Sequence, residues 1–171
     1  SSVNVGTCSN IYNAIQKAEG KYLKAISPGD LFYNKDTLNE WINYMEQKKC
    51  EVSFGDAVFY CQDDNDIHIL ENMSAPVNKH LFSEKQKRRA VFVSYLLAND
   101  TILGAAILIK KDVMKEYLSR MVEKVKYAED YMIRIMIYEG KKVLYYPRNA
   151  IWYEHGTGIS TSKNLKWKAL L

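Results

Sequence analysis

The sequence is poor in the residues that break regular structure, with three Pro and eight Gly among 171 residues. This scarcity excludes Pro-rich or Gly-rich linkers and low-complexity tracts. The three cysteines, Cys8, Cys50 and Cys61, cannot all pair and show no Cys-x-x-Cys spacing, so we expect free thiols in a reducing compartment. No apolar run reaches the roughly 18 residues that a membrane-spanning helix needs, and we therefore expect a cytoplasmic protein.

The composition that is present suits one folded domain. Apolar residues make up 47% of the chain and charged residues 26%, with a formal net charge of +4. This apolar content can build a core, which excludes an intrinsically disordered chain. Charges of both signs are interspersed and no basic–aromatic pattern is present, so we expect no nucleic-acid partner. We expect a single domain over residues 1–171.

Apolar periodicity predicts helices and strands in alternation along the chain. Ser9 or Thr7 is expected to cap the first helix, and Gly20 and Gly140 to end the first and the last helix. The alternation favours an α/β protein with a mixed, mainly parallel sheet and helices on both faces. The expected helices are 8–18, 36 or 37 to 48, 84–97, 111–124 and 128–139, and the expected strands are 21–26, 52–61, 103–109, 143–146 and 150–153, of which the first three are expected to be neighbours.

Three segments, in this order, resemble sequence motifs of the family 2 glycosyltransferases. Residues 4–23 resemble the motif N-x-G-x-x-x-x-x-N-x-x-I-x-x-A-x-G-x-Y-I, which in that family leads into the strand before an acidic metal motif. Residues 128–131 (Ala-Glu-Asp-Tyr), followed by a predicted helix, resemble the family's Glu-Asp motif, and residues 152–160 resemble its later Y-x-x-H-x-x-S-x-S element. Together the three segments span nearly the whole chain.

The resemblance implies a GT-A-like fold, related to the Rossmann folds and incomplete at its N-terminal side. It implies an inverting transfer of a sugar from a nucleotide-sugar donor to a hydroxyl of a saccharide or lipid-linked saccharide acceptor. Enzymes of this kind serve bacterial cell-surface polysaccharide biosynthesis. It also implies that this chain is the central and C-terminal part of a catalytic domain, without the part that binds the nucleotide base, so activity is expected of the full-length enzyme.

The turn Ser27-Pro28-Gly29-Asp30 stands where the family has its D-x-D-D metal motif, or the N-S-G-D form of some members. The resemblance implies that Asp30 and His155 bind Mn²⁺ or Mg²⁺, since carboxylate oxygens suit these ions. From the residues alone, an Asp in a Pro-Gly turn also suits a side chain that bonds its own backbone. The donor and phosphate contacts implied by the resemblance are Asn4, Gly6, Asn10, Ser27, Gly29, Asp30, Gly156 and Thr157, the last two in a segment, 156–162, expected to close over the diphosphate.

Glu129 and Asp130 open the last predicted helix. Acidic residues in a first turn complement the helix dipole by roughly 0.3–1 kcal/mol, which is a purely structural role. The resemblance instead implies that Asp130 is the general base that takes the proton from the acceptor hydroxyl, with Glu129 assisting. We expect Asp30, Asp130 and His155 to lie in one cleft.

A basic cluster opens the predicted helix 84–97. It suits either a solvated helix face or a surface that attracts an anionic acceptor or the inner face of a membrane. The cluster consists of Lys85, Lys87, Arg88 and Arg89.

The alternative to an enzyme is a non-catalytic α/β binding module, or an inactive fragment of such an enzyme. Ser27 and Gly29 favour this alternative, because they stand where metal-binding carboxylates are common in the family. Glu129, Asp130 and His155 favour the enzyme, because a binding module needs no general base.

Overall fold

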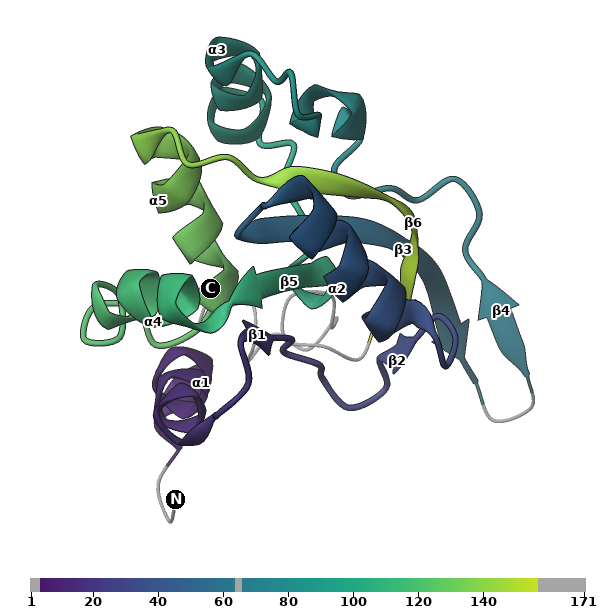
Figure 1. The fold of residues 1–171 in the computed structure, drawn as a ribbon. Helices are drawn as coiled ribbons and strands as arrows, with labels where there is room; N and C mark the ends of the chain where they lie inside the picture. Colours follow the sequence, from purple (N-terminus) through teal and green to yellow (C-terminus); the bar gives the residue numbers. More distant parts are fainter. Residues whose placement is uncertain (1–3, 64–65, 157–171) are drawn as a thin grey trace.

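A six-stranded sheet lies between helices on both of its faces (Figure 1). The structure is a computed structural model that describes residues 4–63 and 66–156. Within these residues the strands run in the order β1-β5-β3-β6-β2, and β4 pairs with the end of β3. The strands are β1 (Tyr22–Leu23), β2 (Leu31–Phe32), β3 (Val52–Gln62), β4 (Ile67–Ile69), β5 (Ile107–Lys110) and β6 (Leu144–Glu154).

The sheet is mixed, as expected, but it is mainly antiparallel. Among the described strands only β3 and β6 are parallel, whereas β1–β5, β3–β5, β2–β6 and β3–β4 are antiparallel. The prediction of a mainly parallel sheet is wrong because it took each helix between two strands for a crossover between neighbours. The helix α2 (Thr37–Lys48) instead connects β2 to β3, which are not neighbours in the sheet.

Two predicted strands, 143–146 and 150–153, are one continuous strand, β6. Pro147 lies between them and has no N–H to donate to a ladder. The pairing of β3 with β6 shifts register on either side of Asp56, and such a bulge accommodates extra residues without ending a strand. Because β6 is continuous and parallel to β3, both strands end at the same edge of the sheet.

The helices lie where the periodicity predicts them, but several are shorter. The predicted helix 84–97 begins only at Arg88 and continues as a π-helical turn, and the predicted helix 111–124 ends at Ser119. The helical segments are α1 (Gly6–Lys17), α2 (Thr37–Lys48), η1 (Lys79–Phe82), α3 (Arg88–Phe92), η2 (Val93–Leu97), η3 (Gly104–Ala106), α4 (Lys111–Ser119), η4 (Glu129–Tyr131) and α5 (Met132–Glu139).

The expected ends of the first helix are wrong, and the expected end of the last is confirmed. α1 begins before Thr7 and Ser9, so neither caps it, and no side-chain cap bond is present. Ala18, rather than Gly20, ends α1 in an extended conformation. Gly140 ends α5 with a φ of 83°, a left-handed conformation that glycine adopts without strain.

Two apolar cores lie on opposite faces of the sheet, which confirms the prediction of helices on both faces. α2 covers one face through the fully buried Trp41 and Met45, and α1, α3, α4 and α5 cover the other. Residues of β5 alternate between the cores, with Ile107 and Ile109 on one side and Leu108 on the other, as the pleat of a strand requires. In the described part of the chain, no helix combines the length and apolar character needed to cross a bilayer.

The expected neighbours 21–26, 103–109 and 52–61 do lie side by side, as β1, β5 and β3. β1 is shorter than expected, because only residues 22–23 pair with β5. The residues after it, 24–30, therefore leave the sheet, and their turn packs against the ends of β3 and β6.

Candidate functional site

Asp30 is a buried carboxylate that ties its turn to the end of β6. Its side chain is 7% exposed, and its Oδ1 accepts a hydrogen bond of 3.2 Å from the backbone N–H of Glu154. Its Oδ2 is also buried and has no hydrogen-bond partner within the described residues. Burial raises the pKa of Asp30, although the backbone N–H of Glu154 and the Lys24 ammonium act against this rise. One oxygen of this carboxylate is therefore buried without a partner among the described residues.

Lys24 carries a positive charge that acts on this carboxylate and favours its ionised form. Its ammonium donates hydrogen bonds to the carbonyl oxygens of Ala25 and Ala105. Burial lowers the pKa of Lys24 to about 8, and the charge of Asp30 opposes this shift. A lysine held in this way keeps its charge close to Asp30 while its donors bind the backbone.

The turn before Asp30 lies directly against the ends of β3 and β6. Gly29 has a φ of 91°, and a Cβ on it would lie 1.8 Å from the carboxylate Oε2 of Glu154. Tyr60, at the end of β3, donates its hydroxyl proton to the carbonyl of Gly29, and its own carbonyl accepts the N–H of His155 at 2.7 Å. A side chain at this position would have a strained φ and would displace the Glu154 carboxylate.

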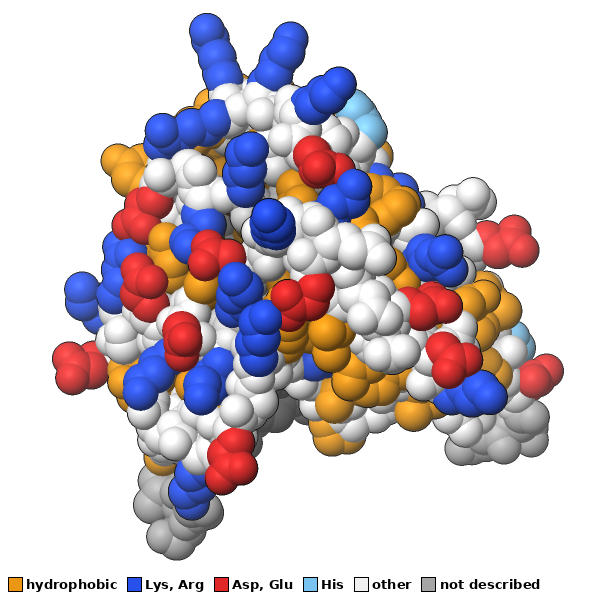
Figure 2. All heavy atoms as spheres, in the orientation of Figure 1, with side chains coloured by type: hydrophobic (Ala, Val, Ile, Leu, Met, Phe, Trp, Pro, Cys, Tyr) orange, Lys and Arg blue, Asp and Glu red, His pale blue; other side chains and the backbone are white. Residues whose placement is uncertain are grey.

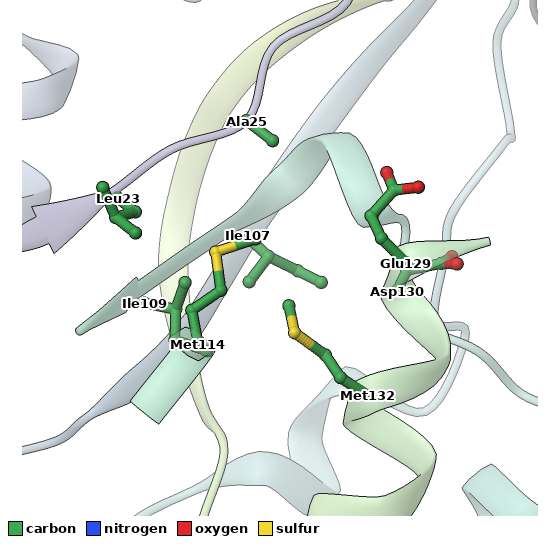
Figure 3. A pocket seen from close by; sticks show the side chains of 9 residues that line it. Leu23, Ala25, Ile107, Ile109, Met114, Glu129, Asp130 and Met132 are labelled. Carbon is green, nitrogen blue, oxygen red and sulfur yellow. The ribbon is translucent and has the colours of Figure 1, made fainter. Parts of the chain in front are cut away.

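Asp130 lies in the turn η4 just before α5, at the rim of a small pocket (Figure 3). Burial, followed by the charge of Glu129, raises the pKa of Asp130 to about 6. The pocket is otherwise mostly apolar, with Leu23, Ile107 and Met132 among its side chains. Its volume of about 20 Å³ suits about one water molecule, so a larger molecule would lie outside it.

The start of α1 packs beside this carboxylate pair. Asn4 accepts the N–H of Gly6 on its Oδ1 at 3.0 Å, and a Cβ on Gly6 would lie 2.2 Å from the carbonyl oxygen of Lys126. Burial and the charges of Glu129 and Asp130 raise the pKa of the Cys8 thiol to about 11. Asn4 and Gly6 therefore stand near the Glu129–Asp130 turn.

The turn η3 joins the two halves of the site. Its Ala105 accepts the hydrogen bond from Lys24, whose charge acts on Asp30. Its neighbour Gly104 packs against Asp130, since a Cβ on Gly104 would lie 3.1 Å from the Cβ of Asp130. The turn η3 thus contacts both Asp130 and Lys24, the lysine whose charge acts on Asp30.

Other residues implied by the resemblance lie apart from this arrangement or outside the described residues. Asn10 is exposed on α1, and Ser27 is exposed in the turn before Asp30. Gly156 is exposed with a φ of 104°, and a Cβ on it would meet nothing within 4 Å. Thr157 and the rest of the segment to residue 162 lie outside the described residues.

The residues around Asp30 suit one kind of metal ion. The unpartnered Oδ2 of Asp30 and the nearby Glu154 carboxylate are oxygen donors, which Mg²⁺ and Mn²⁺ prefer when waters and phosphates complete the shell. His155 does not complete a larger set, because the described residues contain no group of three or more His, Cys, Asp or Glu side chains placed to hold a metal. These residues therefore suit an ion that takes several of its ligands from water or from a bound molecule.

Lys24, Tyr60 and Glu154 belong to this arrangement but were not predicted from the sequence. A lysine within a predicted strand is a signal, because lysine is seldom buried without a partner. Glu154 stands next to His155 in the third resembling segment, so the sequence could have drawn attention to it. Its contact with Gly29 could not be predicted from the sequence. Nothing in the sequence distinguishes Tyr60, because tyrosine is common in strands.

No protein-family model matches this sequence, and no curated protein matches it either. The likeness to family 2 glycosyltransferases therefore depends on the three sequence segments. The geometry of the site has to be judged on its own chemistry.

Proposed function

We propose that this chain belongs to a glycosyltransferase that moves a sugar from a nucleotide-sugar donor to an acceptor hydroxyl with inversion. The observation that carries the proposal is Asp130, a carboxylate whose pKa of about 6 is set by burial and by Glu129. A general base works best when its pKa lies near the pH at which it operates. A carboxylate that only complements a helix dipole needs no such shift.

The proposed reaction moves one proton, forms one bond and breaks another. Asp130 takes the proton of the acceptor hydroxyl as its oxygen bonds to the anomeric carbon. The bond from that carbon to the nucleoside diphosphate breaks on the opposite face, and the diphosphate leaves with the electron pair. Glu129 raises the basicity of Asp130 by placing a second negative charge beside it.

The leaving group would be held beside Asp30. Asp30 and Glu154 are the residues that would bind Mg²⁺ or Mn²⁺, and such an ion stabilises the charge that develops on a diphosphate. Lys24 contributes a fixed positive charge next to Asp30.

The second candidate is a non-catalytic α/β binding module. Ser27 and Gly29 favour it, because the turn keeps a single acidic residue, Asp30. A module of this kind would bind a nucleotide sugar without turning it over.

The test is a screen of nucleotide sugars with the full-length protein that carries this chain, with and without Mn²⁺. Release of a nucleoside diphosphate from at least one donor supports the transferase. Binding of a donor, measured by calorimetry, without release in any condition supports the binding module. Neither binding nor release across the panel would contradict both.

A further inference from the structure

The basic cluster at the start of α3 takes no part in the proposed reaction. Lys87, Arg88 and Arg89 are exposed, and Figure 2 shows Lys and Arg side chains projecting from the α3 end of the molecule, at the top of the view. Within the described residues, the ion pairs involve other cations. Four cations, Lys85, Lys87, Arg88 and Arg89, therefore leave this end of the molecule strongly positive.

Neighbouring carboxylates do not neutralise this charge. Glu84, which precedes the cluster, pairs with Lys48 at 2.5 Å. Glu139, at the end of α5, pairs with Arg120 at 2.6 Å. Both of these carboxylates thus already pair with a cation outside the cluster.

Exposed apolar side chains lie on the same surface. Val91 and Tyr95 are buried on the side of α3 and η2 that faces the core. Val93 and Leu97 are 45% and 71% exposed. Tyr138, at the end of α5, is 65% exposed. Its carbonyl accepts a hydrogen bond from Arg88, so the ends of α3 and α5 form one surface.

We propose that this α3 surface, made of Lys85, Lys87, Arg88, Arg89, Val93, Leu97 and Tyr138, docks the protein on an anionic lipid bilayer. Basic side chains are attracted to anionic headgroups, and apolar side chains beside them enter the interface. A nucleic acid would engage the cations through its phosphates but would leave Val93 and Leu97 without a role. The combination of free cations and exposed aliphatic side chains therefore favours a lipid surface.

The test is sedimentation of the full chain with two kinds of vesicle. One kind is phosphatidylcholine alone, and the other is phosphatidylcholine mixed with phosphatidylglycerol. We expect binding to the anionic vesicles only, and weaker binding as salt is added. Each basic residue near such a surface is worth roughly fivefold in binding, so the double variant Lys87→Glu, Arg89→Glu should bind at least about 25-fold more weakly.

A matched control carries the same change in net charge elsewhere. Lys35 and Lys115 are exposed on other parts of the molecule, so the double variant Lys35→Glu, Lys115→Glu should keep most of the binding. An equal loss in both double variants would overturn the proposal, because it would mean that net charge alone drives the contact. Failure of the unmodified chain to bind anionic vesicles would overturn it too.

A separate variant tests the role of the exposed apolar side chains. Leu97→Ser keeps every charge and should weaken vesicle binding several-fold, with the remaining binding more sensitive to salt. Unchanged binding in Leu97→Ser, or tighter retention on RNA than on vesicles, would contradict a bilayer as the partner. Circular dichroism of each variant checks that the fold is intact. The assay measures no turnover, so its outcome is independent of the proposed sugar transfer.

Discussion

At the scale of single residues, the candidate site depends on two carboxylates that the fold shields from water. Asp30 keeps one unpartnered oxygen in a buried position, and Asp130 is shifted towards neutral pH by burial and by Glu129. Buried charges of this kind cost stability unless they are paired. They are therefore informative, because positions that carry strongly shifted pKa values are concentrated at functional sites.

The variant Asp130→Asn separates catalysis from structure. It keeps the size and hydrogen bonding of the side chain but removes its basicity. General base catalysis is typically worth 10²–10⁴-fold, so we expect kcat of the full-length protein to fall by about that factor while donor binding stays unchanged. Steady-state kinetics and calorimetric titration of the donor measure the two quantities.

Glu129→Gln is the matched control for this substitution. It removes a charge one residue away, and we expect a smaller loss of kcat because Asp130 remains. Turnover of Asp130→Asn close to that of the unmodified enzyme would end its assignment as the base.

The stability of the protein should respond to the titration of Asp130. Its pKa is raised from 3.8 to about 6 in the folded state, so the folded state binds more protons than the unfolded state between these values. The contribution of Asp130 to stability is therefore fully present below pH 3.8 and is lost as the pH rises through about 6. Asp130→Asn should then be more stable than the unmodified chain above about pH 6 and lose this advantage below about pH 4.

Thermal unfolding of both proteins over this pH range measures the effect. A variant that is less stable at neutral pH and loses this deficit below about pH 4 would point to a helix-dipole role for Asp130 instead, because only the charged carboxylate interacts with the dipole.

Gly29 and Gly156 form a pair that isolates the contact with Glu154. Both have positive φ, but a Cβ on Gly29 would overlap the Glu154 carboxylate, whereas a Cβ on Gly156 would meet nothing within 4 Å. Backbone strain is therefore common to Gly29→Ala and Gly156→Ala, and only the first also displaces a side chain. We expect Gly29→Ala to be less stable by about 1–3 kcal/mol more than Gly156→Ala in urea unfolding. Equal losses would show that Glu154 moves aside freely.

At the scale of helices and strands, periodicity predicts where the elements lie, but tertiary contacts decide where they end. Gly140 stops α5 as its sequence predicts, because a left-handed residue satisfies the last carbonyls. α1 begins earlier than its polar residues suggest, where Gly6 packs against the backbone of Lys126. β6 passes Pro147 without ending, because its extra residues bulge out of the pairing with β3.

Asp100 joins the loop before η1 to the end of η2. Its carboxylate accepts the backbone N–H groups of Val77 at 2.6 Å and Asn78 at 2.9 Å, and the hydroxyl of Ser94 at 3.0 Å. Burial acts to raise its pKa, but these donors outweigh burial and hold the pKa of Asp100 below its ordinary value. We expect Asp100→Ala to lower the unfolding free energy by about 1–3 kcal/mol, because three donors lose their acceptor.

The same reasoning sets the pH dependence of this contact. A depressed folded pKa gives stability that is present at neutral pH and lost as the pH falls through the folded value, so the difference between Asp100→Ala and the unmodified chain should shrink below about pH 4. Urea unfolding at neutral and acid pH measures it, with Glu123→Ala, at an exposed position, as a control expected to change stability by less than about 0.5 kcal/mol. A loss in Asp100→Ala no larger than in this control would contradict the role.

The whole molecule is decided by which strands pair and in which direction. The chain predicts an α/β protein with two covered sheet faces and the neighbours β1, β5 and β3, and all of this is confirmed. The parallel pair β3 and β6 joins segments separated by β4, α3, β5, α4 and α5. Nothing in local periodicity specifies such a pairing, because a strand repeats every two residues whichever way its neighbour runs.

The sequence by itself determined the class of fold, the places of the long elements and the acidic residues worth examining, since these follow from periodicity and residue chemistry within short segments. Only the tertiary structure decided the direction of the strands, the burial of Lys24 and the bond from Glu154 to Asp30, whose partners are 124 positions apart. It also brought Lys24 and Asp130 together at η3. These features depend on segments far apart in the chain meeting in space, and the free energy of such contacts comes from burial and pairing that no single segment contains.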